Sequence, residues 1–423
     1  MKAFGKWITN FEFLMEFETF RLDNGLRVLF LQTPSAHTVH CGFLINAGSR
    51  DESDNEHGLA HLIEHCLFKG TNRRKAFHIL SRLDAVGGEL NAYTTKEETC
   101  IYASVLKEHF DRATELLFDI VFSPNFPVKE INKERSVIKD EINSYKDNPD
   151  EQILDEFEER LFPNHALGRS ILGTDKALDT LDRMSIQTFV NRLYSTDHIV
   201  FACVGNVTRK KVEAYCKTLS GIPARKRINA ARTVPKPEGF ELVRNEKVHQ
   251  VHAMIGGTAV GLNDESRREM LLLNNVLGGP ALNSRLNLNI REKFGYCYYI
   301  ESSYNPYTDI GVFEIYFGTD KAHFNRTLKL VRNELKTMAD NSLTPRALVA
   351  AKKQLLGQIA LAQEQLVNMM LSAGKSLLHF DAVDSYEEIE AKVMGISSES
   401  VRLMAEQVFA SDNQNLIAYM PAE

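Results

Sequence analysis

The sequence predicts an α+β fold of two homologous domains, in which each domain is a largely antiparallel sheet packed with helices. The chain has 423 residues, which is too long for one ordinary hydrophobic core. Its strand and helix patterns begin again in the second half, about 210 residues after their first appearance. Within each half the strands and helices are grouped and do not strictly alternate, which favours α+β over α/β. A duplicated α+β architecture is therefore expected.

Apolar and alternating runs define the elements of the first half. Strands are predicted as a pair about an Asn-Gly turn over residues 20–31, and over residues 37–48, 98–106 and 199–205. Helices are predicted around the histidine-containing stretch at residues 56–70, over residues 75–86, 108–121, 127–145 and 151–161, and from a cap at Ser185 to Leu193.

A Pro-rich, basic stretch separates the two halves. It predicts a linker over residues 217–240, between an N-terminal domain at residues 15–216 and a C-terminal domain at residues 241–423. Met15 is a candidate for the native start. The second half then repeats the first, with a strand over residues 248–258, a helix over 268–277, a strand over 308–317, a long helix capped by Thr344 that runs to about Leu371, and a strand over 416–420.

The composition excludes several classes of function. A net charge of −6 and the lack of a sustained basic stripe give no reason to expect a nucleic-acid partner. No apolar run approaches the roughly 20 residues of a membrane span. The first seventeen residues make a poor signal peptide, and the six cysteines form no Cys-x-x-Cys pair. These features predict a cytoplasmic protein with reduced, mostly buried thiols.

The stretch that carries chemistry is His61-Leu-Ile-Glu64-His65. On a helix the two histidines lie one turn apart on the same face, with Glu64 beside them. Two imidazoles so placed can bind one Zn²⁺, and the carboxylate can polarise a water molecule. This is the zinc-protease pattern in reversed order. The alternative is an amphipathic helix with surface histidines.

A catalytic zinc site needs a third protein ligand. The helix predicted over residues 127–145 offers Glu130, Glu134, Asp140 and Glu141. Glu134 and Glu141 lie two turns apart on one face, about 10.5 Å along the helix axis, so one can reach the metal while the other stands behind it. The spacing alone does not choose between these two glutamates, and a solvated acidic face is the alternative.

Several segments together resemble the pitrilysin (M16) family of zinc peptidases, which includes insulin-degrading enzyme, mitochondrial processing peptidase and small two-repeat bacterial peptidases. The resemblance covers nearly the whole chain from about Phe20, and it implies the fold of the mitochondrial processing peptidase-like metallohydrolases. The matching segments are residues 24–26, 58–65, 68–71, 88–94, 134–142, 147–149, 165–169, 171–174, 284–286 and 291–298.

The resemblance implies roles for individual residues. It places the third zinc ligand at Glu141, with one Zn²⁺ per chain, and an assisting acid at Glu134. It makes Glu64 the general base that takes a proton from water and passes it to the leaving amine. It also maps an Arg and a Tyr that act near the scissile peptide onto Arg291 and Tyr298. Without the family match, a salt-bridged Arg and a core Tyr are the simpler interpretation.

The resemblance also implies how substrate binds. Relatives lay the peptide as an added strand on the segment that corresponds to residues 97–106, and Asn91 and Ala92 lead into it. Long members of the family close four repeats into a chamber, so a two-repeat chain needs two copies. A homodimer is expected, with Arg291 and Tyr298 reaching the partner's zinc. A hetero-partner is the other possibility.

The resulting prediction is a zinc-dependent endopeptidase that hydrolyses unfolded peptides or oligopeptides inside a chamber formed by a dimer. The first alternative is a non-catalytic assembly or scaffold subunit of the same fold. The second is a chain that binds zinc but works only beside a separate partner subunit. The intact ligand positions and base argue against the scaffold, because a scaffold has no chemical need for them.

Overall fold

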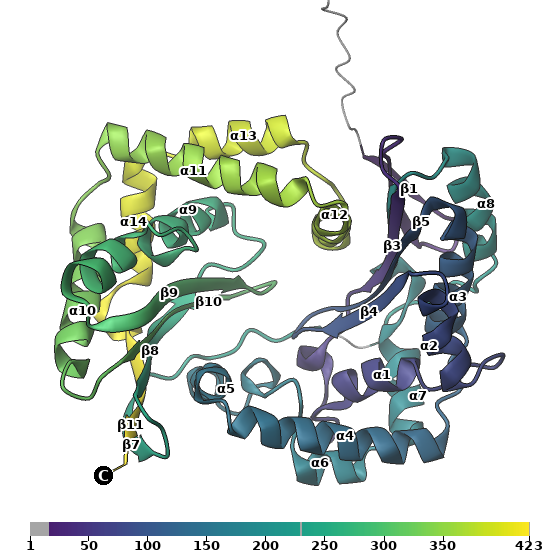
Figure 1. Ribbon diagram of the computed structural model, residues 1–423, viewed down its shortest axis with the longest axis horizontal. Coiled ribbons are helices and arrows are strands. Elements are labelled where there is room, and N and C mark those ends of the chain that lie inside the picture. Colours follow the sequence, from purple (N-terminus) through teal and green to yellow (C-terminus); the bar gives the residue numbers. More distant parts are fainter. Residues whose placement is uncertain (1–16, 229–230, 423) are drawn as a thin grey trace, which may run out of the picture.

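The computed structural model describes residues 17–228 and 231–422, so the suggested start at Met15 lies outside the described residues. Two sheets, each packed with helices, form the two halves of the molecule (Figure 1). This arrangement confirms the predicted fold class of two sheet-plus-helix domains, and each sheet also contains one parallel pair. The predicted boundaries at residues 216 and 241 stay a prediction.

The first sheet has the strand order β1-β2-β6-β3-β5-β4. All neighbours are antiparallel except β2 and β6. Strand β4 was not predicted, because the sequence suggested only that its residues lead into the next strand. The strands of the first sheet are β1 (Glu18–Arg21), β2 (Arg27–Gln32), β3 (Thr38–Ile45), β4 (Glu89–Thr94), β5 (Thr99–Leu106) and β6 (Ile199–Gly205).

A tight turn separates β4 from β5. The Thr95 hydroxyl accepts hydrogen bonds from the backbone N–H groups of Glu97 and Glu98, and the Thr95 N–H donates to the carbonyl of Glu98. Such threonine turns need no glycine or proline, so the sequence carries no strong turn signal here. The hairpin makes β4 the edge strand of the first sheet.

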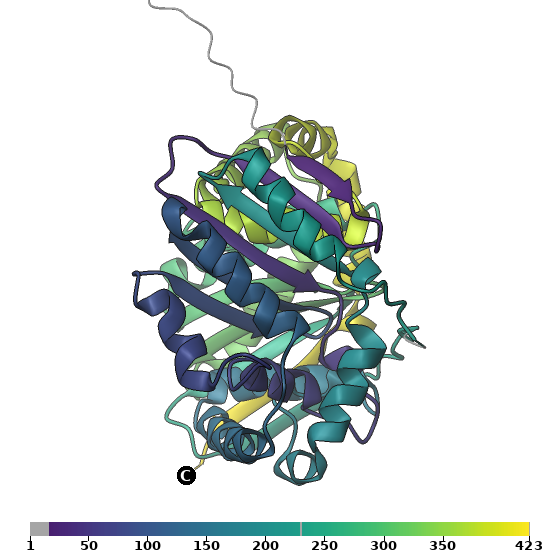
Figure 2. The ribbon, with the colours of Figure 1, turned by 90° about the vertical axis from the view of Figure 1, so that its right-hand side faces the viewer.

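Helices cover the first sheet on its outer face (Figure 2). One predicted cap is wrong: Asp182 is the N-cap of α7, and Ser185 lies one turn inside, where its N–H donates to the Asp182 carboxylate at 2.8 Å. An acid three residues before a serine forms a reciprocal capping box. The helices of this half are α1 (Leu59–Leu67), α2 (Ala76–Asp84), α3 (Phe110–Phe122), α4 (Val128–Lys146), α5 (Pro149–Leu161), α6 (Asp175–Thr180), α7 (Arg183–Leu193) and α8 (Arg209–Ser220).

The second sheet has the order β7-β11-β8-β10-β9, and β7 and β11 are its parallel pair. Its strands are β7 (Glu241–Glu246), β8 (Val251–Ala259), β9 (Cys297–Pro306), β10 (Gly311–Thr319) and β11 (Asn415–Pro421). Its helices are α9 (Arg267–Gly278), α10 (Phe324–Asp340), α11 (Pro345–Gln363), α12 (Leu366–Phe380), α13 (Tyr386–Gly395) and α14 (Ser398–Val408).

The long helix predicted from Thr344 to Leu371 is wrong. It breaks at Glu364 and at Gln365, where the backbone is extended with ψ of 107°. The two pieces cover different surfaces, because α11 packs against α9 of the second half whereas α12 packs against the first sheet. One straight helix could not reach both surfaces, so the tertiary contacts override a continuous helical pattern.

Helix α12 closes the inner face of the first sheet, although it belongs to the second half of the chain (Figure 1). It buries Met370 and Leu377 against Leu29, Leu44 and Val200 on strands β2, β3 and β6. Burial of side chains this large stabilises the fold by about 1.5–3 kcal/mol each. The inner face of the first sheet is therefore covered by a helix from the later part of the second half of the chain.

Helix α5 does the reverse and packs on the second sheet from the first half of the chain. Its residues Ile153 and Phe157 are buried with Met254, Ile417 and Tyr419 of strands β8 and β11. The two halves thus exchange one helix each. We call this pair of packings the helix exchange.

A buried ionic cluster also joins the halves. Arg50 pairs with Glu97 at 2.6 Å and with Asp309 of the second half at 2.6 Å. Arg232 of the irregular segment after α8 pairs with Asp51 at 3.0 Å. The predicted linker therefore begins with the end of α8, and its later part is fixed to the loop that leads into α1.

All six cysteines are free and buried, as the sequence predicts. Cys66 of α1 in particular is buried in the core and is not among the described groups placed to hold a metal. Over residues 17–228 and 231–422, no helix combines the length and the apolar character that crossing a membrane requires.

Candidate metal centre

Helix α1 carries the histidines of the predicted motif. Its residues Leu59, Leu62 and Ile63 are fully buried in the first core and so fix the rotation of the helix. His61 and His65 then share the opposite side, with ring centroids 4.6 Å apart. The one-turn spacing expected from the sequence is therefore confirmed.

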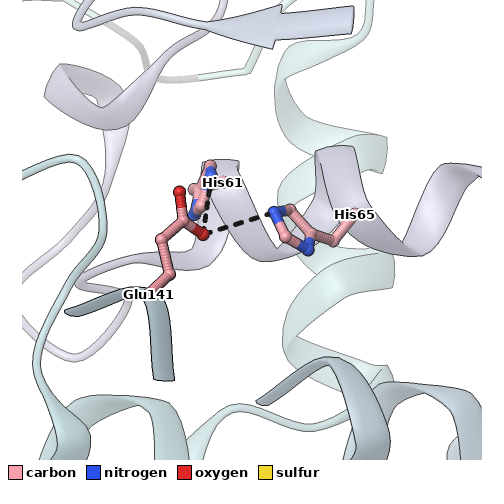
Figure 3. Close-up of side chains that lie close together, drawn as sticks. All are labelled: His61, His65 and Glu141. Carbon is pink, nitrogen blue, oxygen red and sulfur yellow. Dashed lines mark ion pairs between the residues drawn. The ribbon is translucent and has the colours of Figure 1, made fainter. Parts of the chain in front are cut away.

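Helix α4 brings a carboxylate to this pair. Ile131, Ile138 and Ile142 are buried along one face of α4. As a result Glu141 lies against α1, with its Oε2 3.9 Å from Nε2 of His61 and 3.7 Å from Nε2 of His65 (Figure 3). The ligand atoms of these three residues all lie within 4.8 Å of one another.

The chemistry of these three groups fits a zinc ion. Two imidazole nitrogens and one carboxylate are a common ligand set of catalytic zinc, which keeps a further position open. Burial and the neighbouring His65 lower the pKa of His61 to about 4, so His61 is neutral near pH 7. Neutral imidazole is the form that binds metal. Among the described residues, this is the group of three or more potential ligands that could hold an ion.

Glu134 lies behind His65. Its Oε2 is 3.2 Å from Nδ1 of His65, and its Oε1 is 2.9 Å from Nζ of Lys69. The side chain is buried, with an exposed fraction of 4%. A carboxylate on the second nitrogen of a histidine fixes the ring and leaves Nε2 free to bind a metal. The structure thus places Glu141 at the two Nε2 atoms and Glu134 behind one ring.

Glu64 projects from α1 beside the cluster. Thr94, at the end of β4, donates its hydroxyl to Oε2 of Glu64 at 2.5 Å. Burial raises the pKa of Glu64, and the charge of Glu141 adds to that effect, whereas the Thr94 hydrogen bond opposes it. A carboxylate with a raised pKa, held at a fixed position, is suited to accept a proton.

A cavity of about 400 Å³ opens beside these groups. Asn91 and Ala92 of β4 line it together with Glu64, His65 and Glu134. Among the described strands, β4 has β5 as its neighbour on one side and an open edge on the other. The predicted segment for strand addition is therefore wrong, because β5 is paired on both sides, with β3 and β4. The free edge belongs to β4.

Arg291 and Tyr298 lie in the other half and have no contact with this cluster in the described part of the chain. Arg291 lies in the last turn of a short π-helical segment (Asn287–Glu292), where its guanidinium donates to Oδ1 of Asn287 at 3.1 Å and lies 3.5 Å from the carboxylate of Glu292. Tyr298 lies on the edge strand β9, and 82% of it is exposed. The interpretation of Arg291 as a salt-bridged residue agrees with its contact to Glu292. The interpretation of Tyr298 as a core residue is wrong, because its side chain is exposed.

Two contact residues of the site were missed at the sequence level. These are Thr94, which holds Glu64, and Lys69, which pairs with Glu134. Both lie inside segments that match the pitrilysin family, Gly88–Thr94 and Phe68–Thr71. Their place in these segments is the signal by which the sequence could have indicated a role at the site. Their contacts, however, depend on how β4 and α4 pack against α1.

Sequence similarity to known proteins identifies the family of this chain. A profile of insulinase (peptidase family M16) matches residues 27–175, and a profile of the peptidase M16 inactive domain matches residues 180–355. An uncharacterized zinc protease of Bacillus subtilis, YmxG, is 32% identical over 391 residues, covering 92% of this chain and 95% of the relative. The chain belongs to the M16 peptidase family. The resemblance drawn from the motifs is therefore confirmed.

A further sequence relative and two solved structures are also similar to this M16 peptidase family member. An uncharacterized zinc protease of Streptomyces coelicolor is 33% identical over 395 residues, which cover 92% of this chain and 86% of that protein. A peptidase M16 inactive domain from Pseudomonas fluorescens has the same fold, with a TM-score of 0.89 at 20% identity, covering 96% and 98% of the chains. A protease from Helicobacter pylori gives 0.88 at 19% identity, covering 97% and 100%.

Proposed function

We propose that this chain is a zinc-dependent endopeptidase that hydrolyses unfolded peptides or oligopeptides. One observation carries the proposal: His61, His65 and Glu141 converge from two helices, and Glu64 stands on the same helix as the histidines. The similarity to bacterial proteins named as zinc proteases supports the proposal. Residues 180–355, most of which belong to the second half, match a profile described as an inactive domain, and this supports a single site per chain.

His61, His65 and Glu141 would hold one zinc ion, and a bound zinc ion supplies Lewis acidity toward a peptide carbonyl and a water molecule. Glu64 would take the proton from the attacking water and deliver it to the leaving amine nitrogen. Thr94 keeps Oε2 of Glu64 in place for this task. Glu134 orients His65.

The open edge of β4 is the proposed place for the substrate backbone, with Asn91 and Ala92 in contact with it. Backbone hydrogen bonds to an edge strand give affinity with little sequence selectivity. Arg291 and Tyr298 are proposed to act from the second copy of a homodimer, whose two chains enclose the chamber, and a hetero-partner remains the alternative. Six free, buried cysteines support a reducing, cytoplasmic location.

Cleavage of a fluorogenic peptide library tests the proposed activity. The wild-type protein with one zinc per chain should cleave, and a chelator should abolish cleavage. Glu64→Gln should retain zinc but lose activity by about 10²–10⁴-fold, because the general base is removed. Glu130→Gln is the matched control, since Glu130 lies on α4 and pairs with Lys133 on the surface. Zinc-loaded wild type that cleaves no peptide would favour the scaffold subunit.

Mixed dimers test whether the site is shared between chains. Chains with Glu64→Gln and chains with Arg291→Ala should each be inactive alone. If Arg291 acts on the partner's site, hybrid dimers contain one intact site and recover part of the activity. Absence of recovery in hybrids that are shown to form would exclude sharing.

A further inference from the structure

The beginning of helix α1 lacks a side-chain cap of its own. The helix has 9 residues, its N-cap is Gly58, and the backbone there is left-handed with φ of +89°. A Cβ at Gly58 would lie 2.9 Å from Cα of Gly173 and from the carbonyl oxygen of Leu172. No capping side chain can therefore stand at this position. The free N–H groups of the first turn need an acceptor from elsewhere.

Glu52 supplies that acceptor from the preceding loop. Its Oε2 accepts from the N–H of Gly58 at 2.9 Å, and its Oε1 accepts from the N–H of Ala60 at 2.7 Å. The exposed fraction of Glu52 is 6%. Burial raises the pKa of Glu52, and the two N–H donors oppose this rise because they favour the carboxylate. An acidic group is also favoured by the dipole at a helix N-terminus.

The position of this contact matters because Ala60 immediately precedes His61. If the first turn of α1 moves, His61 moves with it relative to Glu141, which is fixed on another helix. The rest of the loop is held independently, since Arg50 and Asp51 bind the second half and the irregular segment after α8. Glu52 thus links a rigid loop to the first turn of the helix that carries the histidines.

Glu56 provides a comparison within the same loop. It is buried to a similar degree, with 7% exposed, and its carboxylate binds Arg192 at 2.7 Å and accepts from the N–H of Ser53 at 2.9 Å. These side-chain contacts do not involve the N–H groups of α1. Glu52 and Glu56 are therefore similarly buried, but only the side chain of Glu52 binds N–H groups at the start of α1.

We propose that Glu52 is a positioning residue that clamps the first turn of α1 and thereby sets the place of His61 in the metal centre. The inference rests on the proposed function only in taking the cluster as a zinc site. Its test needs no peptide cleavage, because zinc affinity and backbone protection report on it directly.

The experiment compares Glu52→Gln with Glu56→Gln in the full chain. Glutamine keeps the shape of Glu52 but offers one acceptor oxygen, so one N–H of the turn loses its partner. Zinc affinity, measured by competition with a fluorescent chelator, should fall on the order of tenfold in Glu52→Gln. Hydrogen exchange of the amides at residues 58–62 in the metal-free protein should become faster. Glu56→Gln should change neither quantity.

A further readout separates positioning from a general loss of structure. If the proposed activity is present, Glu52→Gln should recover it when zinc is raised to saturation. Amides outside residues 58–62 of the metal-free variant should exchange as in the wild type, whereas a generally destabilised protein would exchange faster throughout. If Glu52→Gln fails to fold, Glu52→Asp replaces it, since the shorter carboxylate keeps its charge but cannot span both N–H groups. Unchanged zinc affinity and exchange in a folded Glu52 variant would overturn the proposal. Equal losses in the Glu52 and Glu56 variants would also overturn it.

Discussion

At the scale of single residues, Glu134 is expected to set the zinc affinity through His65. Replacement by Gln removes the anionic partner of His65 Nδ1 and leaves Lys69 without its ion pair. Such changes behind a metal ligand typically weaken binding by about 10–100-fold. Competition with a fluorescent chelator measures this loss, and Glu130→Gln on the same helix should bind zinc as the wild type does. An unchanged affinity in Glu134→Gln would mean that the contact has no influence on the site.

The residues of the site were predicted to different degrees. His61, Glu64 and His65 lie within one turn of a helix, so a helical period alone brings them together. The choice between Glu134 and Glu141 needed the angle at which α4 crosses α1, which no local pattern contains, and only the family resemblance made it. Thr94 was out of reach for the same reason, because its contact joins an edge strand to a helix that lies thirty residues earlier.

At the scale of elements, the close contact of α12 with the first sheet makes a sharp prediction. A Cβ at Gly374 would lie 2.6 Å from Cδ1 of Leu44 and 3.3 Å from Cβ of Ala202. Gly374→Ala should therefore lower the free energy of unfolding by about 1–3 kcal/mol. In α11, a Cβ at Gly357 would meet no described atom within 4 Å, so Gly357→Ala should raise the free energy of unfolding by about 0.5–1 kcal/mol. Chemical denaturation measures both, and equal effects would contradict the packing of α12.

Most elements of the first half were predicted, whereas β7, β9, α10, α13 and α14 of the second half were not. Buried strands such as β3 and β6, and helices such as α4, have strong apolar patterns. Strand β4 is only half-buried, and its turn at Thr95 has no glycine or proline. The break between α11 and α12 arises because α11 packs against α9 of the second half whereas α12 packs on the first sheet. In both places the deciding contacts lie far away in the sequence.

At the scale of the whole molecule, a buried acid should make stability depend on pH. Glu314 on β10 is 2% exposed, and its Oε1 has no hydrogen-bond partner within residues 17–228 and 231–422. Burial raises the pKa of Glu314 above its usual range, and the charge of Glu158 adds to this. Above pH 4.5 the folded state then holds a proton that the unfolded state has lost. This contribution makes stability fall as pH rises, by up to about 1.4 kcal/mol per pH unit.

Glu314→Gln should remove this dependence. The variant carries a neutral side chain at every pH, so its stability relative to the wild type should increase as pH rises from 5 toward 8. Urea denaturation of the metal-free proteins across this range measures the difference. A difference that stays constant with pH would show that Glu314 does not titrate differently in the folded and unfolded chains.

The helix exchange predicts that the halves do not fold separately. A fragment of residues 1–240 lacks α12 over Leu29, Leu44 and Val200 and leaves the apolar face of α5 uncovered. It should bind hydrophobic dyes and aggregate, whereas coexpression with residues 241–423 should give a folded two-chain complex. Calorimetry and size-exclusion chromatography measure the outcome. Cooperative unfolding of the isolated fragment would contradict this prediction.

The order of synthesis gives the helix exchange a further consequence. The last strand of the first sheet ends at Gly205, and α12 begins at Leu366, about 160 residues later. At 5–20 residues per second, a ribosome needs roughly 8–30 s to make the intervening stretch. During that interval the nascent sheet has one apolar face without its cover. Chaperones that bind growing chains should therefore engage this face before the rest of the protein exists.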